Sequence, residues 1–273
     1  MRHDRHRQGR NKWAAQAGVF LAVTFVGAGL LGAVQPAIGI PGEVIELPQF
    51  GPALGVLAVA LLWPLRTRAL LAGALPGGTR GASRDVSSWL LLATALVIIA
   101  LATGTYALLT GDAHLTDPRT LAHPFALIVT AQLVGACGEE IGWRCLLQPL
   151  LRTRFRPLTA SVVVGVVWGL WHVQVLGRAP AYAAGFLLGA TAMSVVLGLG
   201  LERVRANRLL LAGGFHTLVN LGMLLCMDEE SGKVLPMVLF GLAALVAALP
   251  WVLLRSTVAD APAGTTRIPA EAR

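Results

Sequence analysis

The sequence predicts an all-α membrane protein whose helices form one polytopic bundle. Of its 273 residues, 55% are hydrophobic and only 13% are charged, and the mean hydropathy is +0.68. Soluble domains carry about 25% charged residues, so the composition excludes an ordinary soluble fold. A helix needs about 20 apolar residues to cross a bilayer. The chain is long enough for about eight transmembrane helices joined by short loops.

Eight apolar segments mark the expected helices. The second segment is short, and the fourth is long enough to tilt strongly or to begin at the membrane surface. Glycine and proline occur inside several segments, which helices packed in a membrane tolerate. The segments are Trp13–Val34, Phe50–Leu65, Trp89–Leu109, Leu121–Leu151, Leu158–Leu176, Ala181–Leu201, Leu209–Met227 and Val234–Leu254.

Basic residues are distributed unevenly between the loops, and this predicts the topology. All but four of the 22 Lys and Arg residues lie in the two tails and in the loops after the second, fourth and sixth segments. The four exceptions are Arg119, Arg178 and Lys233 in the other loops and Arg144 inside the fourth segment. Cytoplasmic loops are enriched in Lys and Arg, so both termini are expected in the cytoplasm. The net charge of +8 then needs no nucleic-acid partner.

The chain is expected to form one membrane domain with a tail at each end. A basic cytoplasmic tail covers residues 1–12, the membrane domain covers residues 13–255, and a small, polar segment over residues 256–273 predicts a disordered tail. The first apolar run, about 22 residues long, exceeds the core of a signal peptide and should remain as the first helix. No internal repeat is evident. We expect a multi-pass protein of a bacterial plasma membrane.

Ionisable residues inside the expected helices are candidates for function. They are Glu139, Glu140, Arg144, His172 and His216. Each costs several kcal/mol in hydrocarbon unless it is paired or hydrated. Glu140 and Arg144 are four residues apart on one helix face and can form an ion pair, which leaves Glu139 without a partner. The unpaired carboxylate is the residue that most needs a functional explanation.

Two further helices carry polar or aromatic pairs at the same spacing. Trp168 and His172 are four residues apart, and so are His216 and Asn220. At about 1.5 Å per residue, these side chains and Glu139 lie roughly 10–20 Å from the cytoplasmic ends of their helices. We therefore expect them to meet in one intramembrane cavity. A carboxylate and a histidine can act as general base there, while a second histidine and an amide can stabilise an oxyanion.

These residues resemble the three motifs of a protease family. The segments EEIGWR (Glu139–Arg144), WGLWH (Trp168–His172) and HTLVN (His216–Asn220) are similar to motifs of the CAAX protease and bacteriocin-processing family, also called CPBP or Abi. The motif-bearing region covers about residues 121–228. The second family motif commonly reads Phe-xxx-His, so Trp168 is a mild departure. The resemblance implies an all-α intramembrane endopeptidase, labelled a metalloendopeptidase, that acts in CAAX-box protein processing.

The resemblance also implies a role for each matching residue. Glu139 and His172 would activate the attacking water, and His216 and Asn220 would stabilise the oxyanion. Glu140, Arg144 and Trp168 would support the site. A divalent metal such as zinc, held by Glu139, His172 and His216, and a metal-free glutamate mechanism both use these residues. The sequence has no HExxH motif, which favours the metal-free mechanism.

Two other classes of function compete with a protease. The substrate of a protease would be a membrane-associated peptide or protein in the lipid bilayer. A non-catalytic membrane protein could instead bind a peptide, confer immunity to a bacteriocin or act as a scaffold. A secondary transporter could use Glu139 or Glu140 as a proton site, but inverted repeats are expected of transporters and none is found here.

Overall fold

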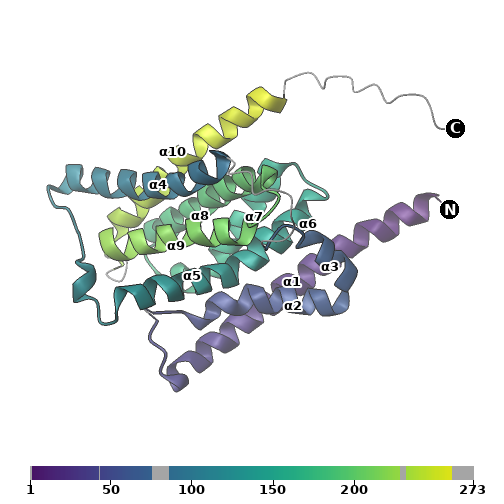
Figure 1. The fold of residues 1–273 in the computed structure, drawn as a ribbon, viewed down its shortest axis with the longest axis horizontal. Helices are drawn as coiled ribbons and strands as arrows, with labels where there is room; N and C mark the ends of the chain where they lie inside the picture. Colours follow the sequence, from purple (N-terminus) through teal and green to yellow (C-terminus); the bar gives the residue numbers. More distant parts are fainter. Residues whose placement is uncertain (1, 43, 76–85, 228–231, 260–273) are drawn as a thin grey trace.

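The computed structural model describes residues 2–42, 44–75, 86–227 and 232–259. All regular elements in these ranges are helical, which confirms the predicted all-α class (Figure 1). The longer helices are α1 (Arg2–Ile38), α2 (Gly51–Leu62), α3 (Pro64–Leu70), α4 (Val86–Thr110), α5 (Phe125–Gly142), α6 (Gln148–Arg152), α7 (Pro157–Trp171), α8 (Pro180–Gly200), α9 (Arg208–Cys226) and α10 (Val234–Ala259). The short helical turns are η1 (Leu47–Phe50), η2 (Pro118–Thr120), η3 (Trp143–Leu147), η4 (Val173–Gly177) and η5 (Leu201–Arg203).

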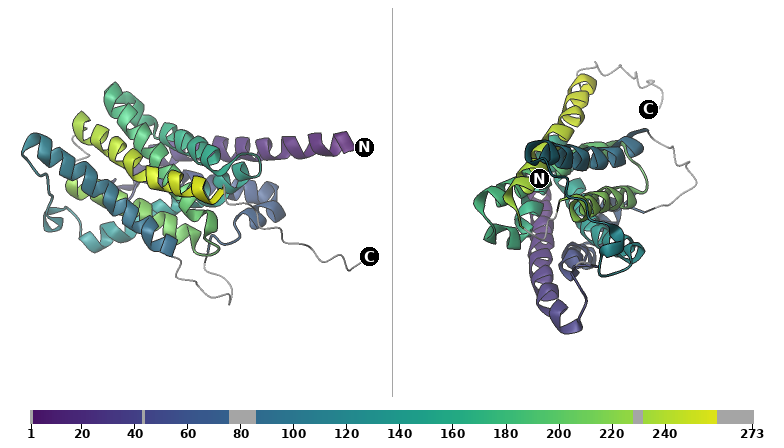
Figure 2. Two further views of the ribbon diagram at one scale, coloured as in Figure 1. Left: turned by 90° about the horizontal axis from the view of Figure 1, so that it is seen from above. Right: turned by 90° about the vertical axis from the view of Figure 1, so that its left-hand side faces the viewer.

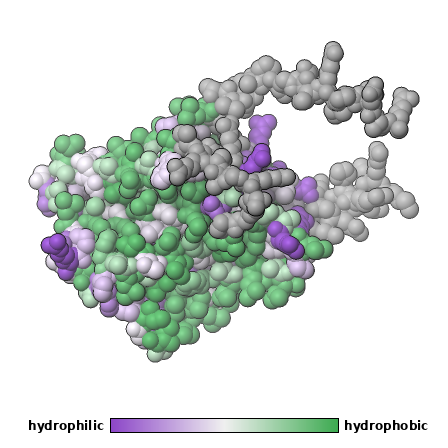
Figure 3. All heavy atoms as spheres, viewed as in Figure 1, coloured by the Kyte–Doolittle hydropathy of each residue, from purple (hydrophilic) through white to green (hydrophobic). Residues whose placement is uncertain are grey.

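Six helices within the described ranges are long and apolar enough to cross a membrane. They are Trp13–Ile38, Ser88–Thr110, Phe125–Arg152, Pro180–Gly200, Arg208–Cys226 and Val234–Leu254. The other two predicted segments form the shorter apolar helices Leu47–Leu62 and Pro157–Trp171. Apolar side chains cover much of the visible surface, and hydrophilic patches lie toward its two ends (Figure 3). The chain is a multi-pass membrane protein.

Both ends of the described chain lie toward the same end of the bundle. The start of α1 and the end of α10 are found there in two perpendicular views (Figures 1 and 2). Two cytoplasmic termini require this arrangement, although the side of the membrane stays a prediction. Residues 2–12, expected as a tail, continue α1, and residues 256–259 continue α10. The rest of the predicted disordered tail, residues 260–273, lies outside the described residues.

The fourth predicted segment is less regular than its sequence suggests. Helix α5 begins at Phe125, after Pro124, and not at Leu121, because a proline disfavours helical backbone at the residue before it. The helix then widens into the π-helical turn η3 before α6. Such turns are rare and are often found at functional sites. This one begins at Trp143, three residues after Glu140, and contains Arg144.

A row of glycines on α5 lets the segment from α1 to α2 approach closely. A Cβ on Gly135 would overlap the side-chain oxygen of Gln49, and one on Gly138 would lie 2.9 Å from the ring of Phe50. A Cβ on Gly142 would lie 2.5 Å from Pro52 and 3.0 Å from Phe20. Small residues of this kind allow membrane helices to pack with their backbones close together. The row fixes η1 and α2 against the helix that carries the acidic motif.

Replacing Gly142 by alanine should therefore destabilise the bundle. The added methyl group has no free space between Pro52 and Phe20, and overpacking of this kind costs about 1–3 kcal/mol. Gly104→Ala in α4 is the matched control, because nothing lies within 4 Å of its Cβ position. Thermal unfolding in detergent should show a lower midpoint for G142A and an unchanged or higher midpoint for G104A. Equal midpoints for the two variants would contradict close packing at Gly142.

Candidate functional site

A cavity of about 1020 Å³ lies among the helices and contains the predicted catalytic residues. Glu139, His172, His216 and Asn220 all line it, together with Trp168. Other parts of the wall come from α1, η1, the segment around η2, η4, α8 and α10. The upper end of the usual size range for ligand pockets is about 1000 Å³, so a peptide segment can be accommodated. The sequence motifs from α5, α7 and α9 thus meet at one place.

The Glu139 carboxylate is held by two donors from different parts of the chain. The indole Nε1–H of Trp168 donates to Oε2 over 2.8 Å. The side-chain Nε2–H of Gln49 donates to Oε1 over 3.2 Å. Because Glu139 is only 1% exposed, bulk water cannot solvate its carboxylate, and these two hydrogen bonds take the place of that solvation. An ionised carboxylate can accept about four hydrogen bonds, so each oxygen retains accepting capacity for a water molecule or a substrate.

The Glu140 carboxylate joins α5 to α9. Its Oε2 lies 3.3 Å from Nε of Arg144, as the spacing of the two residues predicted, and both side chains are fully buried. Its Oε1 accepts a bond from Nδ1–H of His216 over 3.1 Å. The Arg144 guanidinium also lies 4.7 Å from the centre of the Trp168 ring, which gives a cation–π contact. Glu140 therefore contacts both Arg144 and His216. Arg144, which belongs to the first motif, also contacts Trp168 of the second motif.

The charges in this buried group can balance. Glu139 and Glu140 contribute two negative charges, and Arg144 contributes one positive charge. Protonated His216, next to the Glu140 carboxylate, would contribute the second positive charge. A group with no net charge is far less costly to bury in a membrane than one with an unpaired carboxylate. The arrangement explains how two adjacent glutamates are accommodated in an apolar helix.

His172 lies at the end of α7 and not within a continuous helix. The predicted segment ran on to Leu176, but α7 stops at Trp171, and the 3₁₀ turn η4 follows. At this helix end the backbone N–H of His172 donates to the Gly169 carbonyl over 3.3 Å, and Nδ1 of His172 lies 2.9 Å from the Trp168 carbonyl oxygen. A carbonyl only accepts, so Nδ1 carries the proton and Nε2 of the neutral ring carries a lone pair. His172 is thus in the tautomer that a general base needs at Nε2.

Asn220 is oriented by a residue that the motifs do not include. Its Nδ2 donates to Oε1 of Gln132 on α5 over 3.0 Å, and both residues line the cavity. The amide NH₂ has two hydrogens, so one remains for another acceptor. His216, one helical turn earlier on α9, lies with its ring 5.1 Å from that of Trp168. The two residues expected to stabilise an oxyanion therefore lie on the same cavity wall.

The proposed metal ligands do not form a ready metal site. Among the described residues, no group of three or more His, Cys, Asp or Glu side chains is close enough to hold one ion. The Nδ1 atoms of His172 and His216 bond the Trp168 carbonyl and Glu140, which leaves Nε2 of each ring as its remaining nitrogen. Whether Glu139, His172 and His216 hold a divalent metal stays open, as it was from the sequence, and no step below depends on a metal.

Gln49, Gln132 and Glu46 contribute to the cavity but carry no motif signal. Glu46 directly precedes the turn η1 and is one of the residues that line the cavity. Burial raises the pKa of Glu46, and the negative charge of Glu139 raises it further. A polar residue at the edge of an apolar segment was the available sequence signal for Gln49. That signal does not say which distant residue the side chain will meet.

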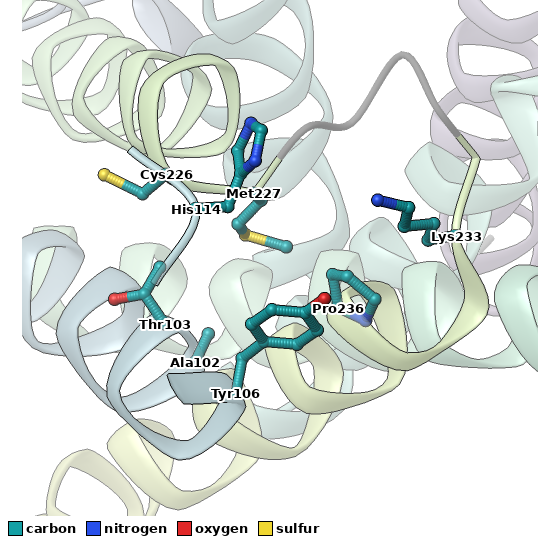
Figure 4. A pocket seen from close by; sticks show the side chains of 8 residues that line it. All are labelled: Ala102, Thr103, Tyr106, His114, Cys226, Met227, Lys233 and Pro236. Carbon is teal, nitrogen blue, oxygen red and sulfur yellow. The ribbon is translucent and has the colours of Figure 1, made fainter. Parts of the chain in front are cut away.

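A second hollow lies apart from the motifs. It is formed by α4, the loop before η2 and the ends of α9 and α10, with Tyr106, His114 and Lys233 among its lining residues (Figure 4). Its volume of about 10 Å³ leaves room for about one water molecule. None of its lining residues also lines the large cavity. The large cavity is therefore the candidate site.

The fold and the site define a multi-pass helical membrane protein with a buried cluster of acidic, basic and aromatic side chains beside a large cavity. In a comparison with known families, residues 121–222 match the family described as "Type II CAAX prenyl endopeptidase Rce1-like". This match contains all three motifs and confirms the family resemblance.

Curated relatives extend the similarity beyond the motifs. The chain is 24% identical over 243 residues to "Lysostaphin resistance protein A" from Staphylococcus aureus, for example in strains RF122 / ET3-1, Newman and USA300. The aligned region covers 88% of this chain and 57% of each relative, so the chain spans little more than half of their length. Bacterial relatives and apolar helices together support the predicted multi-pass bacterial membrane protein.

Removing one partner of the buried ion pair should be strongly destabilising. Glu140→Gln keeps the side-chain size but removes the carboxylate that pairs with Arg144 and bonds His216, and breaking a buried ion pair costs about 3–5 kcal/mol. Glu202→Gln is the matched control, because Glu202 pairs with Arg152 at 2.6 Å and is partly exposed. Such pairs contribute only about 0–1 kcal/mol. Unfolding in detergent should separate the two variants clearly, and a similar loss in both would contradict the buried role of Glu140.

Proposed function

We propose that this protein is an intramembrane endopeptidase that hydrolyses a peptide bond of a membrane-associated substrate. The observation that carries the proposal is that Glu139, His172, His216 and Asn220 line one large cavity within the membrane helices. The family match over residues 121–222 supports the same class of activity. The substrate would be a peptide segment at or within the bilayer that enters this cavity.

The reaction would begin with proton removal from a water molecule. Glu139 has accepting capacity beyond its bonds to Gln49 and Trp168, and His172 has a free lone pair at Nε2. The activated water would add to the carbonyl carbon of the substrate. When the C–N bond breaks, the proton held by the base would pass to the leaving amine. The products are a new carboxylate and a new amine, so the atoms balance.

His216 and Asn220 would stabilise the negative charge that forms on the substrate oxygen. The Nδ1–H of His216 is directed to Glu140, so a protonated ring would present its Nε2–H to the oxyanion. Asn220 has one amide hydrogen in addition to the one bonded to Gln132. Removing one such donor from an enzyme typically lowers kcat about 10²–10³-fold. Glu140 and Arg144 would act indirectly, by holding His216 and Trp168.

A non-catalytic role in resistance is the second candidate. The relatives carry the name "Lysostaphin resistance protein A", which describes a phenotype and not a reaction. In this case the cavity would bind a peptide without cleaving it. Glu139→Gln discriminates the two functions, because it keeps the shape of the side chain but removes the base. Loss of the cellular phenotype in this variant favours catalysis, and retention favours binding.

Cleavage by purified protein tests the proposed function directly. In detergent or in vesicles, wild-type protein should cleave a membrane-associated peptide, and Glu139→Ala and His172→Ala should each lose about 10²–10⁴-fold in rate. Glu202→Gln is the control, because it removes a carboxylate from a partly exposed ion pair. This variant should retain the rate of the wild type. The same assay after chelation, with and without added zinc, tests for a metal. Full activity in both alanine variants would exclude the mechanism.

A further inference from the structure

The turn before α2 forms a wall of the candidate site. Glu46 and Gln49 both line the cavity, although the motifs lie far from them in the sequence. Gln35 on α1 holds this turn in place: its Nε2–H donates to the Ile45 carbonyl over 3.0 Å, and its Oε1 accepts from the Leu47 N–H over 2.8 Å. The turn is thus a fixed element that presents two polar side chains to the site.

Gln49 is the member of this turn that touches the proposed catalytic base. It is 9% exposed, and its Nε2–H donates to Glu139 Oε1 over 3.2 Å. Only the amide nitrogen can donate a hydrogen bond to an ionised carboxylate, because the amide oxygen is itself an acceptor. Its oxygen, Oε1, has no hydrogen-bond partner within the described structure. A buried amide oxygen without a hydrogen bond is costly. The bond from the Gln49 amide nitrogen to Glu139 explains why the amide is nevertheless held in this orientation.

The surface of α5 is shaped for this contact. A Cβ on Gly135 would overlap Gln49 Oε1, and a Cβ on Gly138 would lie 3.1 Å from the Gln49 carbonyl oxygen. Any larger residue at position 135 would push the amide away from α5. The absence of a side chain at this position, one turn before Glu139, lets Gln49 reach the carboxylate.

From these contacts, we propose that Gln49 is a positioning residue that fixes the Glu139 carboxylate for proton removal, acting opposite Trp168. The proposal rests on the proposed function and adds a residue outside the three motifs. With one donor on each oxygen, from η1 and from α7, the carboxylate cannot rotate about its terminal bond without losing a hydrogen bond. The remaining accepting positions then keep a constant direction relative to the cavity.

Gln49→Met tests this role because methionine keeps a similar length and volume but cannot donate. A hydrogen bond to a charged group is worth a factor of about 10–100 in an equilibrium or a rate. In the peptide-cleavage assay, Q49M should lower kcat by about that factor with little change in KM. Gly135→Ala should cause a similar fall, because it displaces the same amide without replacing it. An unchanged kcat in Q49M would overturn the proposal.

Gln35→Met is the matched control for a purely structural effect. It loosens the same turn but removes no contact to Glu139, so it should lower the unfolding midpoint more than Q49M does. Its loss of kcat should be the smaller of the two. If Q35M and Q49M change kcat, KM and the unfolding midpoint in the same way, Gln49 merely supports the turn, and the proposal is wrong.

An infrared measurement separates this proposal from the proposed function. The carboxylate stretching band of Glu139, assigned in ¹³C-Glu-labelled protein by difference from Glu139→Gln, should shift in Q49M and stay unchanged in Q35M. This readout needs no cleavage. A shifted band in protein that cleaves no peptide would support the contact while the proposed function fails. An unshifted band would overturn the positioning role whether or not the protein is a protease.

Discussion

The site depends on the shared carboxylate of Glu140. This one group neutralises Arg144 on its own helix and bonds His216 on α9. Arg144 in turn lies against Trp168 on α7, so three helices are joined through four buried side chains. A buried carboxylate in a membrane is costly unless it is paired or hydrated. Glu139 lines the large cavity and Glu140 is not among its lining residues, so Glu139 is the carboxylate that can face a substrate.

Close packing at the glycines of α5 brings the second hydrogen-bond donor, Gln49, to the Glu139 carboxylate. The row of small residues on α5 admits η1 and α2, and through them Gln49. Without this approach, the Glu139 carboxylate would have Trp168 as its single donor among the described residues. The large cavity then lies beside a carboxylate that is bonded at both oxygens. Backbone packing and the electrostatics of the site are therefore set by the same helix surface.

The sequence predicted the parts of this site that follow from spacing along one helix. Composition indicated an all-α membrane bundle, and the four-residue spacing predicted the Glu140–Arg144 pair. Contacts between distant segments could not be predicted in this way: Gln49 and Glu139 are 90 residues apart, and Gln132 and Asn220 are 88 apart. The end of α7 at His172 was also missed, because the apolar pattern continues while the backbone changes to a 3₁₀ turn. Local patterns place residues on helices, and tertiary packing selects their partners.

The most direct test of the account is to compare the ends of membrane-protein fragments in cells. Membranes with wild-type protein and with Glu139→Ala should be analysed by mass spectrometry after chemical labelling of new peptide termini. If Glu139 activates the attacking water, some membrane-associated proteins should accumulate as uncut precursors in the variant, and their new termini should occur in the wild type alone. Identical sets of termini in both membranes, with both proteins present in equal amounts, would contradict a proteolytic role for Glu139.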